Sequence, residues 1–592
     1  MEAGKEIKRE VSPVITLENN PFTPPKDGAC LINQLPPELL SHIFELGVRE
    51  ENIQDDDDED EDEAMGELDI LMGSMPPFFE VKNLKGAEDL GDDAGEGGTK
   101  SPTSSGSSDV SSEDEYEPKF QVLVSHVCKH WRTVALSTPA LWTVINIGPI
   151  ERSALERVQC LVERSKGLPV SIRIDCEPPD DEDSEDDADS PGGGDPKPIS
   201  LNDLNALLDI LVPHVQRWRT FELSVSSYEL MFATLLKLSA PSVPAATHLE
   251  CLQLYHHEEA ETDIFPSPEY SAPLTLFGGE APRIQTLALW GVHVNWNQNW
   301  LAGGTQLVDL ELAYHTEDVR PSWAAFVRIL RGSPTLETLT FSASGPAGAP
   351  EDWRAERGDV DDKDGLNDVI ELPNLTDLVL AYHPVEYVSA LMRKLALPSL
   401  KNLTLDLEED DFSNFVLQLS GPAPTPSGVK RDNAPSILNG LESLKISGLP
   451  CNDRTINTMY AELNHLQALN LSMDYLVPTF FKNLSVTSAQ PGAEKSKVWL
   501  PALTVLTTSG VSGPEMRELI TARREAGYPL KMVFMEENDD VDPSDVEWLR
   551  ENVEKFDFFE GSDDEFDLDV LGDDEDGEEG EEDEWEDMHE LD

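Results

Sequence analysis

The dominant pattern of apolar positions along the chain is L-x-x-L-x-L, with apolar variants. The last two apolar positions of each copy are two residues apart, so a strand would place both on its buried face. The intervals between copies range from 23 to 41 residues. Ten copies start at Trp218, Leu249, Ile284, Leu307, Leu336, Leu375, Leu400, Leu441, Leu466 and Leu503. The repetition predicts a strand at each copy.

Segments with helical periodicity lie between several of these copies, for example residues 322–333 and 385–397. Residues 155–174 and 204–218 predict helix-plus-strand units ahead of the array. Residues 514–526 predict a last helix, followed by a strand near 530–534. Stacked strand-plus-helix units form a solenoid with a parallel sheet on its concave side. The intervals lie near or above the 20–29 residues of leucine-rich repeats, which this array resembles. The predicted fold class is therefore α/β.

Two shorter apolar segments precede the array. In residues 31–46, Leu35, Leu39, Ile43 and Leu46 recur at helical spacing. In residues 120–142, the apolar positions Val124, Val127, Trp131 and Val134 share one helical face. Each segment is too short to bury its own apolar stripe, so we expect the two to pack together or against a partner.

The letters LPPELLSHIF and SHVCKHWRTVALSTPALW in these two segments resemble the F-box, the adaptor-binding motif of ubiquitin-ligase substrate receptors. An F-box is normally contiguous, whereas residues 48–119 separate the two blocks here. Loop closure becomes costlier only logarithmically with length, so the two blocks can still pack together. The whole layout is similar to fungal F-box proteins with C-terminal leucine-rich repeats.

The resemblance implies which residues grip a Skp-type adaptor, and through it a cullin ligase. Those that form or support the adaptor surface are Leu35, Pro36, Glu38, Leu39, Ile43, Phe44, Val127, Cys128, Trp131, Pro139, Leu141 and Trp142. Some of them can instead be the inner face of a helical hairpin. Leu39, Ile43 and Val127 can belong either to the adaptor interface or to the inner face of a hairpin. The motif favours the adaptor interface for Pro36, Cys128 and Trp142.

Charge changes the picture of the segments between these elements. The 592 residues include 116 Asp or Glu and 43 Lys or Arg, a net charge of −73. Binding to a nucleic-acid backbone is therefore excluded, since it depends on Lys and Arg. More than half of the excess lies in residues 50–63, 180–189 and 562–592, which contain no Lys or Arg. Such tracts are typical of disordered segments, although they can also attract a basic partner.

The predicted organisation follows from these boundaries. We expect a disordered N-terminus at 1–27 and an F-box-like block at 28–147, interrupted by a disordered insert at about 50–118. A repeat array at 150–535 carries an acidic insert at about 178–198, and an acidic, mostly disordered tail covers 536–592. Serines followed three residues later by an acid are candidates for phosphorylation: Ser111, Ser112, Ser184 and Ser562. Six widely spaced cysteines and the lack of a long apolar segment predict an intracellular protein of the cytoplasm or nucleus, away from membranes.

Aromatic residues recur just past the predicted strands and are candidates for a substrate-binding face. Alternation places Tyr255 and Trp290 on the concave face, and Tyr314 and Tyr382 at the turn from strand to loop. Aromatic side chains are enriched in protein interfaces. The alternative is that these rings pack the loops of the solenoid.

The sequence contains no phosphate-binding loop, nucleophile elbow or zinc-protease motif. His126, His130 and Cys128 could form a metal site, but they lie within the F-box-like block, so no metal or cofactor is predicted. The chain is therefore expected not to be an enzyme but a substrate-recognition adaptor of a ubiquitin ligase. Two alternatives remain: a repeat scaffold that does not engage a ligase, and an acidic chaperone-like binder of basic proteins.

Overall fold

A computed structural model describes residues 32, 35–57, 119–148, 154–176, 199–257, 270–302, 306–353, 369–408, 410–425, 435–473, 475–485 and 498–559. The four phosphorylation candidates, Ser111, Ser112, Ser184 and Ser562, lie outside these residues. The described chain belongs to two compact units, one with residues up to 307 and 315–320, the other with 308–314 and the residues from 321 onward. No described helix is both long and apolar enough to cross a membrane.

Three α-helices and a short 3₁₀ turn form the N-terminal block of the first unit. They are α1 (Pro37–Asp57), α3 (Phe120–Val127), α4 (Lys129–Ser137) and η2 (Pro139–Trp142). α1 begins at Pro37, where a missing backbone donor does no harm. It ends at Asp57, so the first acidic tract, predicted to be disordered, begins inside a helix. The two sequence blocks pack together as expected, and their shared core consists of Leu40, Phe44, Val48, Val124, Val134, Ala135, Leu141 and Trp142.

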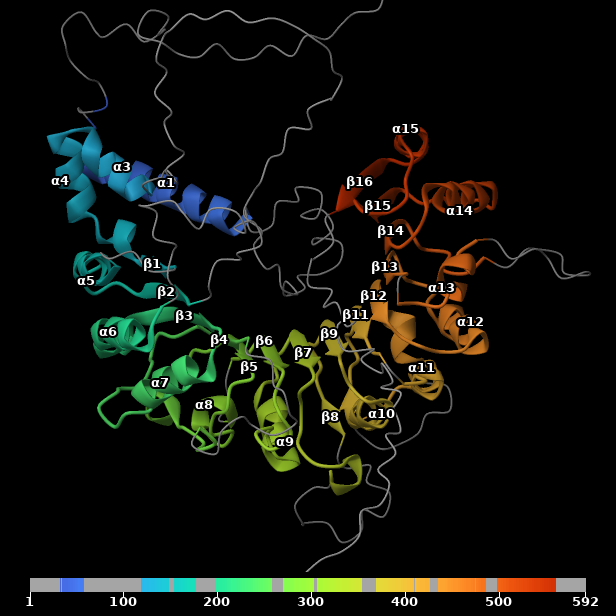
Figure 1. Ribbon diagram of the computed structural model, residues 1–592, viewed down its shortest axis with the longest axis horizontal. Helices are drawn as coiled ribbons and strands as arrows, with labels where there is room; N and C mark the ends of the chain where they lie inside the picture. Colours follow the sequence, from blue (N-terminus) through green and yellow to red (C-terminus); the bar gives the residue numbers. More distant parts are fainter. Residues whose placement is uncertain are drawn as a thin grey trace, which may run out of the picture. The chain divides into compact units, whose positions relative to one another are not determined.

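Strands and helices alternate through the rest of the first unit (Figure 1). The strands are β1 (Val144–Ile147), β2 (Val170–Asp175), β3 (Trp218–Val225), β4 (Cys251–His256) and β5 (Thr286–Trp290). The helices are α5 (Ala154–Arg164), α6 (Leu201–Leu211), η3 (Val212–Arg217), α7 (Tyr228–Leu238), η4 (Leu276–Gly279) and α8 (Asn299–Ala302). The predicted units at 155–174 and 204–218 correspond to α5–β2 and α6–β3.

The second unit continues the alternation. Its strands are β6 (Asp309–Ala313), β7 (Thr338–Ser342), β8 (Ile370–Glu371), β9 (Asp377–Ala381), β10 (Leu395–Ala396), β11 (Asn402–Asp406), β12 (Ser443–Gly448), β13 (Ala468–Ser472), β14 (Val505–Ser509), β15 (Met532–Glu536) and β16 (Lys555–Phe559). Its helices are α9 (Trp323–Gly332), η5 (Pro350–Asp352), α10 (Val385–Lys394), α11 (Ser413–Leu419), η7 (Ile437–Gly440), α12 (Asp453–Glu462), α13 (Thr479–Lys482), α14 (Gly513–Glu525) and α15 (Pro543–Asn552).

Among the described residues, fourteen strands form one sheet in chain order, and β8 pairs separately with β10. Within each unit the pairing is parallel, and the leucine positions face one another, as in Leu310 with Leu339 and Leu339 with Leu378. The ten predicted motif copies correspond in order to β3, β4, β5, β6, β7, β9, β11, β12, β13 and β14. The predicted fold class is confirmed: this is an α/β protein with a long all-parallel sheet, like a leucine-rich-repeat solenoid.

Within the described residues, the repeat array extends beyond its predicted bounds at both ends. β1 lies inside the block assigned to the F-box, and α15 and β16 lie inside the segment assigned to the acidic tail. Pro543 opens α15 at a position that suits proline, and Leu549 is its fully buried anchor. β16 pairs with β15 through five residues in register. The expected tail therefore has one more helix and strand before residue 560, because two buried apolar side chains, Leu549 and Phe556, hold them to the array.

Helices and strands separate onto two sides within each unit (Figure 1). In the first unit α5, α6 and α7 follow one side of the strands, and in the second α9, α10, α11 and α12 do so. Strand residues alternate accordingly: in β4, Leu252 and Leu254 are fully buried, whereas Gln253 and Tyr255 are half-buried. We call the side of the strands that carries Gln253 and Tyr255, and its equivalent in every other strand, the helix-distal face.

Candidate functional site

The N-terminal helices are fixed to one another by contacts between the two sequence blocks. Phe44 of α1 packs on Trp131 of α4 with ring centroids 5.1 Å apart. The Thr138 hydroxyl donates a 3.0 Å hydrogen bond to Ser41. A Cβ atom at Gly47 would lie 2.3 Å from the Phe120 ring, so glycine at this position leaves room for the ring where α1 approaches α3. The interrupted block thus has a defined geometry.

The twelve predicted adaptor contacts fall into three groups. The exposed group is Pro36, Glu38, Leu39, Ile43 and Val127. The half-buried group is Leu35, Cys128, Trp131 and Pro139. The buried group is Phe44, Leu141 and Trp142. The exposed side chains can touch a partner directly, while the buried ones can only support the surface from within.

Trp142 illustrates the supporting role. Its indole N–H donates a 3.0 Å hydrogen bond to the Ala135 carbonyl, and its ring belongs to the core of the helical block. The guanidinium of Arg164 on α5 lies 4.6 Å from the ring centroid, a cation–π contact. Trp142 therefore connects the helical block to the first repeat helix. In the free protein it is a core residue, although the motif favoured it as an interface residue.

Cys128, another motif position, is a helix cap. Its sulfur accepts a 3.5 Å hydrogen bond from the backbone N–H of Trp131 at the start of α4. This use of the side chain separates α3 from α4 and sets the angle between them. No group of three His, Cys, Asp or Glu side chains among the described residues could hold a metal ion.

Two exposed apolar stripes lie on these helices. Leu39 and Ile43 on α1 are 53% and 43% exposed, and Val127 on α3 is 61% exposed. Three further exposed residues of the same block, Leu46, Leu123 and Leu136, are not among the adaptor contacts that the resemblance implies. Leu46 belongs to the predicted helical stripe of α1, at i+3 from Ile43, and Leu123 precedes Val127 by one turn, so helical spacing could have added both to the candidate surface.

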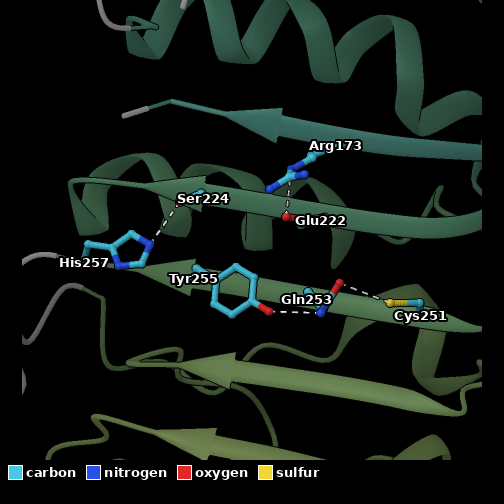
Figure 2. A network of polar contacts seen from close by, with 7 residues as sticks. All are labelled: Arg173, Glu222, Ser224, Cys251, Gln253, Tyr255 and His257. Carbon is cyan, nitrogen blue, oxygen red and sulfur yellow. Dashed lines mark hydrogen bonds and ion pairs between the residues drawn. The ribbon is translucent and has the colours of Figure 1, made fainter. Parts of the chain in front are cut away.

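The helix-distal face of the first unit carries a polar network across β2, β3 and β4 (Figure 2). Arg173 and Glu222, side by side in the register of β2 and β3, form a 3.0 Å ion pair. The Gln253 amide donates a 3.0 Å hydrogen bond to the Tyr255 hydroxyl, and the Cys251 thiol donates a 3.3 Å bond to the Gln253 carbonyl oxygen. These contacts hold the polar side chains in fixed positions on the strands.

One pair in this network could suggest enzymatic chemistry. The Ser224 hydroxyl and His257 Nε2 are 3.0 Å apart. Nucleophilic catalysis also needs a third group that orients the base and donors for the oxyanion. The ring neighbours of His257 include Tyr255 and Trp290, and neither side chain is a carboxylate that could orient the imidazole. The Ser224–His257 contact belongs to the polar network of this face.

The predicted substrate-face aromatics lie where alternation placed them. Tyr255 packs edge to face on Trp290 with centroids 5.2 Å apart, and Trp290 is buried. Tyr314 and Tyr382 follow β6 and β9 directly, with φ of 53° and 56°. Their rings are 6.3 Å apart and their side chains are 44% and 43% exposed. A positive φ is strained for a tyrosine, so the surrounding structure must stabilise this backbone conformation at both positions.

Tyr382 is also part of a charged group at the ends of the strands. Its hydroxyl donates a hydrogen bond to Asp406, and burial together with the nearby Asp406 carboxylate raises the pKa of Tyr382. Burial raises the pKa of Asp406 itself, against the opposing effects of the Tyr382 hydrogen bond and of Lys445. The result is a surface of aromatic rings bordered by carboxylates.

Comparison with models of known protein families and with curated protein sequences finds no match to this chain. The repeat architecture is therefore established by the sheet, its register and the buried leucines.

Proposed function

We propose that the chain is an F-box-type substrate receptor. Its helices α1, α3 and α4 would bind a Skp-type adaptor of a cullin-containing ubiquitin ligase, and its repeats would hold a target protein. The observation that carries this proposal is the exposed apolar surface of Leu39, Ile43 and Val127 on helices whose letters resemble an F-box. Neighbouring large apolar side chains left in water are typical of protein interfaces.

The packing inside the helical block supports the same function. Side chains of both sequence blocks share one core, so the insert at 48–119 does not prevent the two blocks from assembling. Trp142 and Arg164 join this block to the first repeat helix. A receptor of this kind needs such a rigid connection, because its contribution to ubiquitin transfer is to hold a target lysine at high effective concentration near other subunits.

Binding of a purified Skp-type adaptor to the full chain tests the proposal. We expect Leu39→Asp and Val127→Asp each to weaken the affinity about 30-fold or more, because a charge at the centre of a desolvated interface costs about 2 kcal/mol or more. Neither substitution should lower the melting temperature, since both side chains are exposed. Surface plasmon resonance would measure the affinity.

Leu236→Asp is the matched control. Leu236 on α7 is 54% exposed, nearly the same as Leu39, but it lies in the repeat array. It should bind the adaptor like the wild type. If the wild-type chain does not bind the adaptor, or if all three variants bind equally well, the repeat scaffold without a ligase becomes the better description.

A further inference from the structure

Two carboxylates share one row of the helix-distal face in the second unit, at the start of β6 and β9 on either side of β7. Asp309 of β6 is in register with Thr338 of β7, which is in register with Asp377 of β9. In the next row of the same face, Glu311 of β6 lies opposite Thr340 of β7. Asp377 and Glu311 are both buried. Three acidic side chains are thus concentrated in a region with little access to water.

The hydrogen bonds of this region are incomplete. Asp377 accepts a 2.6 Å hydrogen bond from the Asn402 amide and another from the Thr376 hydroxyl. The Oδ1 atom of Asp309 and the hydroxyl of Thr340 are buried and have no hydrogen-bond partner. Thr340 is only 1% exposed and lies in register with Glu311 of β6 on one side and with Val379 of β9 on the other, one row from Asp309 and Asp377. A buried acceptor and a buried hydroxyl left without partners are costly for the folded state, and a donor placed there would relieve that cost.

The electrostatics indicate the charge of the missing donor. Burial, with the neighbouring Asp377, raises the pKa of Asp309 to about 6. A carboxylate that is poorly solvated and close to a second one is stabilised by a nearby positive charge. The described residues offer no group of three ligands suited to a metal ion. A cationic side chain, with several N–H donors, fits both the charge and the unmet hydrogen bonds.

A second feature of the same strands extends this surface. Tyr314 and Tyr382 follow the last residues of β6 and β9, the strands that begin with Asp309 and Asp377. Tyr314 stands five positions after Asp309, which corresponds to about 16 Å along a strand. Exposed tyrosine rings attract Lys and Arg side chains through their faces and accommodate the aliphatic stems. Asp406, which accepts the Tyr382 hydrogen bond and interacts with Lys445, also lies beside the Tyr382 ring.

We propose that this surface binds an extended basic segment of the target protein, with one Lys or Arg between Asp309 and Asp377 and a second against the rings of Tyr314 and Tyr382. The chain's own acidic tracts have the wrong charge to occupy it. An extended segment rises about 3.3 Å per residue, so the two basic residues would be about four to six positions apart. The proposal deepens the proposed function, on which it rests, by giving the chemistry of the target.

Fluorescence anisotropy with the full chain tests this without any adaptor. The probe is a labelled twelve-residue Gly/Ser peptide with two lysines five positions apart, at physiological salt. We expect it to bind more tightly than the same peptide with adjacent lysines, and the peptide with two glutamates not to bind. Asp309→Asn should weaken binding of the first peptide about fivefold or more. Because this substitution removes a repulsion between acids, it should not impair folding.

Glu518→Gln is the matched control, since it makes the same change at an exposed position on α14. It should leave the affinity unchanged. Equal weakening by Asp309→Asn and Glu518→Gln would show attraction to net charge alone and would overturn the proposal. A higher melting temperature for Asp309→Asn with unchanged peptide affinity would also overturn it, because the cluster would then be only a site of strain. Loss of adaptor binding with intact peptide binding would refute the proposed function alone.

Discussion

Arg523 on α14 offers a sharp test of how the last repeats are held together. Its side chain is fully buried. One guanidinium nitrogen donates to the carbonyls of Leu484 and Trp499 at 3.1 and 3.2 Å, and the other to that of Leu500 at 2.9 Å. These carbonyls belong to the chain before and after residues 486–497. Arg523 therefore ties two distant stretches of backbone to one helix.

The expected effect of Arg523→Met follows from two opposing contributions. Hydrogen bonds from a charged donor contribute about 1.5–3 kcal/mol each, so three contribute at least about 4.5 kcal/mol. Burial of the charge opposes them: it lowers the pKa of Arg523 to about 10, equivalent to about 3.4 kcal/mol. Methionine fills a similar volume without donors. We therefore expect a loss of at least about 1 kcal/mol in the stability of this region.

Hydrogen exchange followed by mass spectrometry measures that loss locally, which matters because a chain of two units need not unfold in one step. A loss of at least about 1 kcal/mol should raise exchange about fivefold or more in peptides covering β14 and α14. Peptides covering β2–β4, in the other unit, should exchange as in the wild type. Arg524→Met is the control, because Arg524 is an exposed neighbour that donates to Asn552.

The reasoning would be refuted by two results. If Arg523→Met exchanged like the wild type, burial of the charge would cancel the hydrogen bonds fully. If Arg524→Met raised exchange as much as Arg523→Met, the effect would come from positive charge on α14 rather than from the three carbonyls.

Two further predictions concern buried groups. Trp142→Ala should destabilise the first unit by about 3–5 kcal/mol, measured by urea unfolding, while Trp142→Phe should lose less and keep adaptor binding. A stable Trp142→Ala variant that no longer binds the adaptor would instead make Trp142 a direct contact. Because the pKa of Asp309 is raised to about 6, the folded state binds the proton of this carboxyl more tightly than the unfolded state does. The protonated Asp309 therefore stabilises the fold fully below about pH 4, and this contribution is lost as the pH rises through 6. Asp309→Asn should therefore match the wild type in thermal melts near pH 4 and exceed it by about 1–3 kcal/mol near pH 8; equal stability at both pH values would contradict this.

The strands could be predicted because the apolar residues of each motif copy are stable only in the buried core. Leu249, Leu252 and Leu254 are all fully buried, and so are their counterparts Leu466, Leu469 and Leu471. A spacing of two residues on a strand fixes which side faces the helices, so the placement of Tyr255 followed directly. The ten copies gave the order of strands, because parallel repeats stack in sequence.

Other features depend on contacts between segments far apart in the chain. β16 carries a variant of the motif, with Val553, Phe556 and Phe558 at the apolar positions, but α15 and β16 stand next to an acidic tract, so composition predicted a tail where a helix and a strand pack on the array. The motif placed Trp142 with Pro36 at the interface, but only the fold shows that its ring contacts Arg164. A resemblance identifies a position; it does not distinguish a side chain that touches a partner from one that supports the surface.

The row that contains Asp309 and Asp377 could be recognised only from the register of the strands. Once the leucines are aligned, the residue before the second leucine of each copy falls in one row, so Asp309 and Asp377 face the same side with one strand between them. Nothing in the local sequence marks these two acids among 116 acidic residues. Their significance comes from burial, from the hydroxyl of Thr340 that lacks a donor or acceptor, and from the short path to Tyr314. The buried leucines of the repeats keep the acids of this row close together. Because two neighbouring carboxylates with little access to water repel each other, a cation placed between them is stabilised.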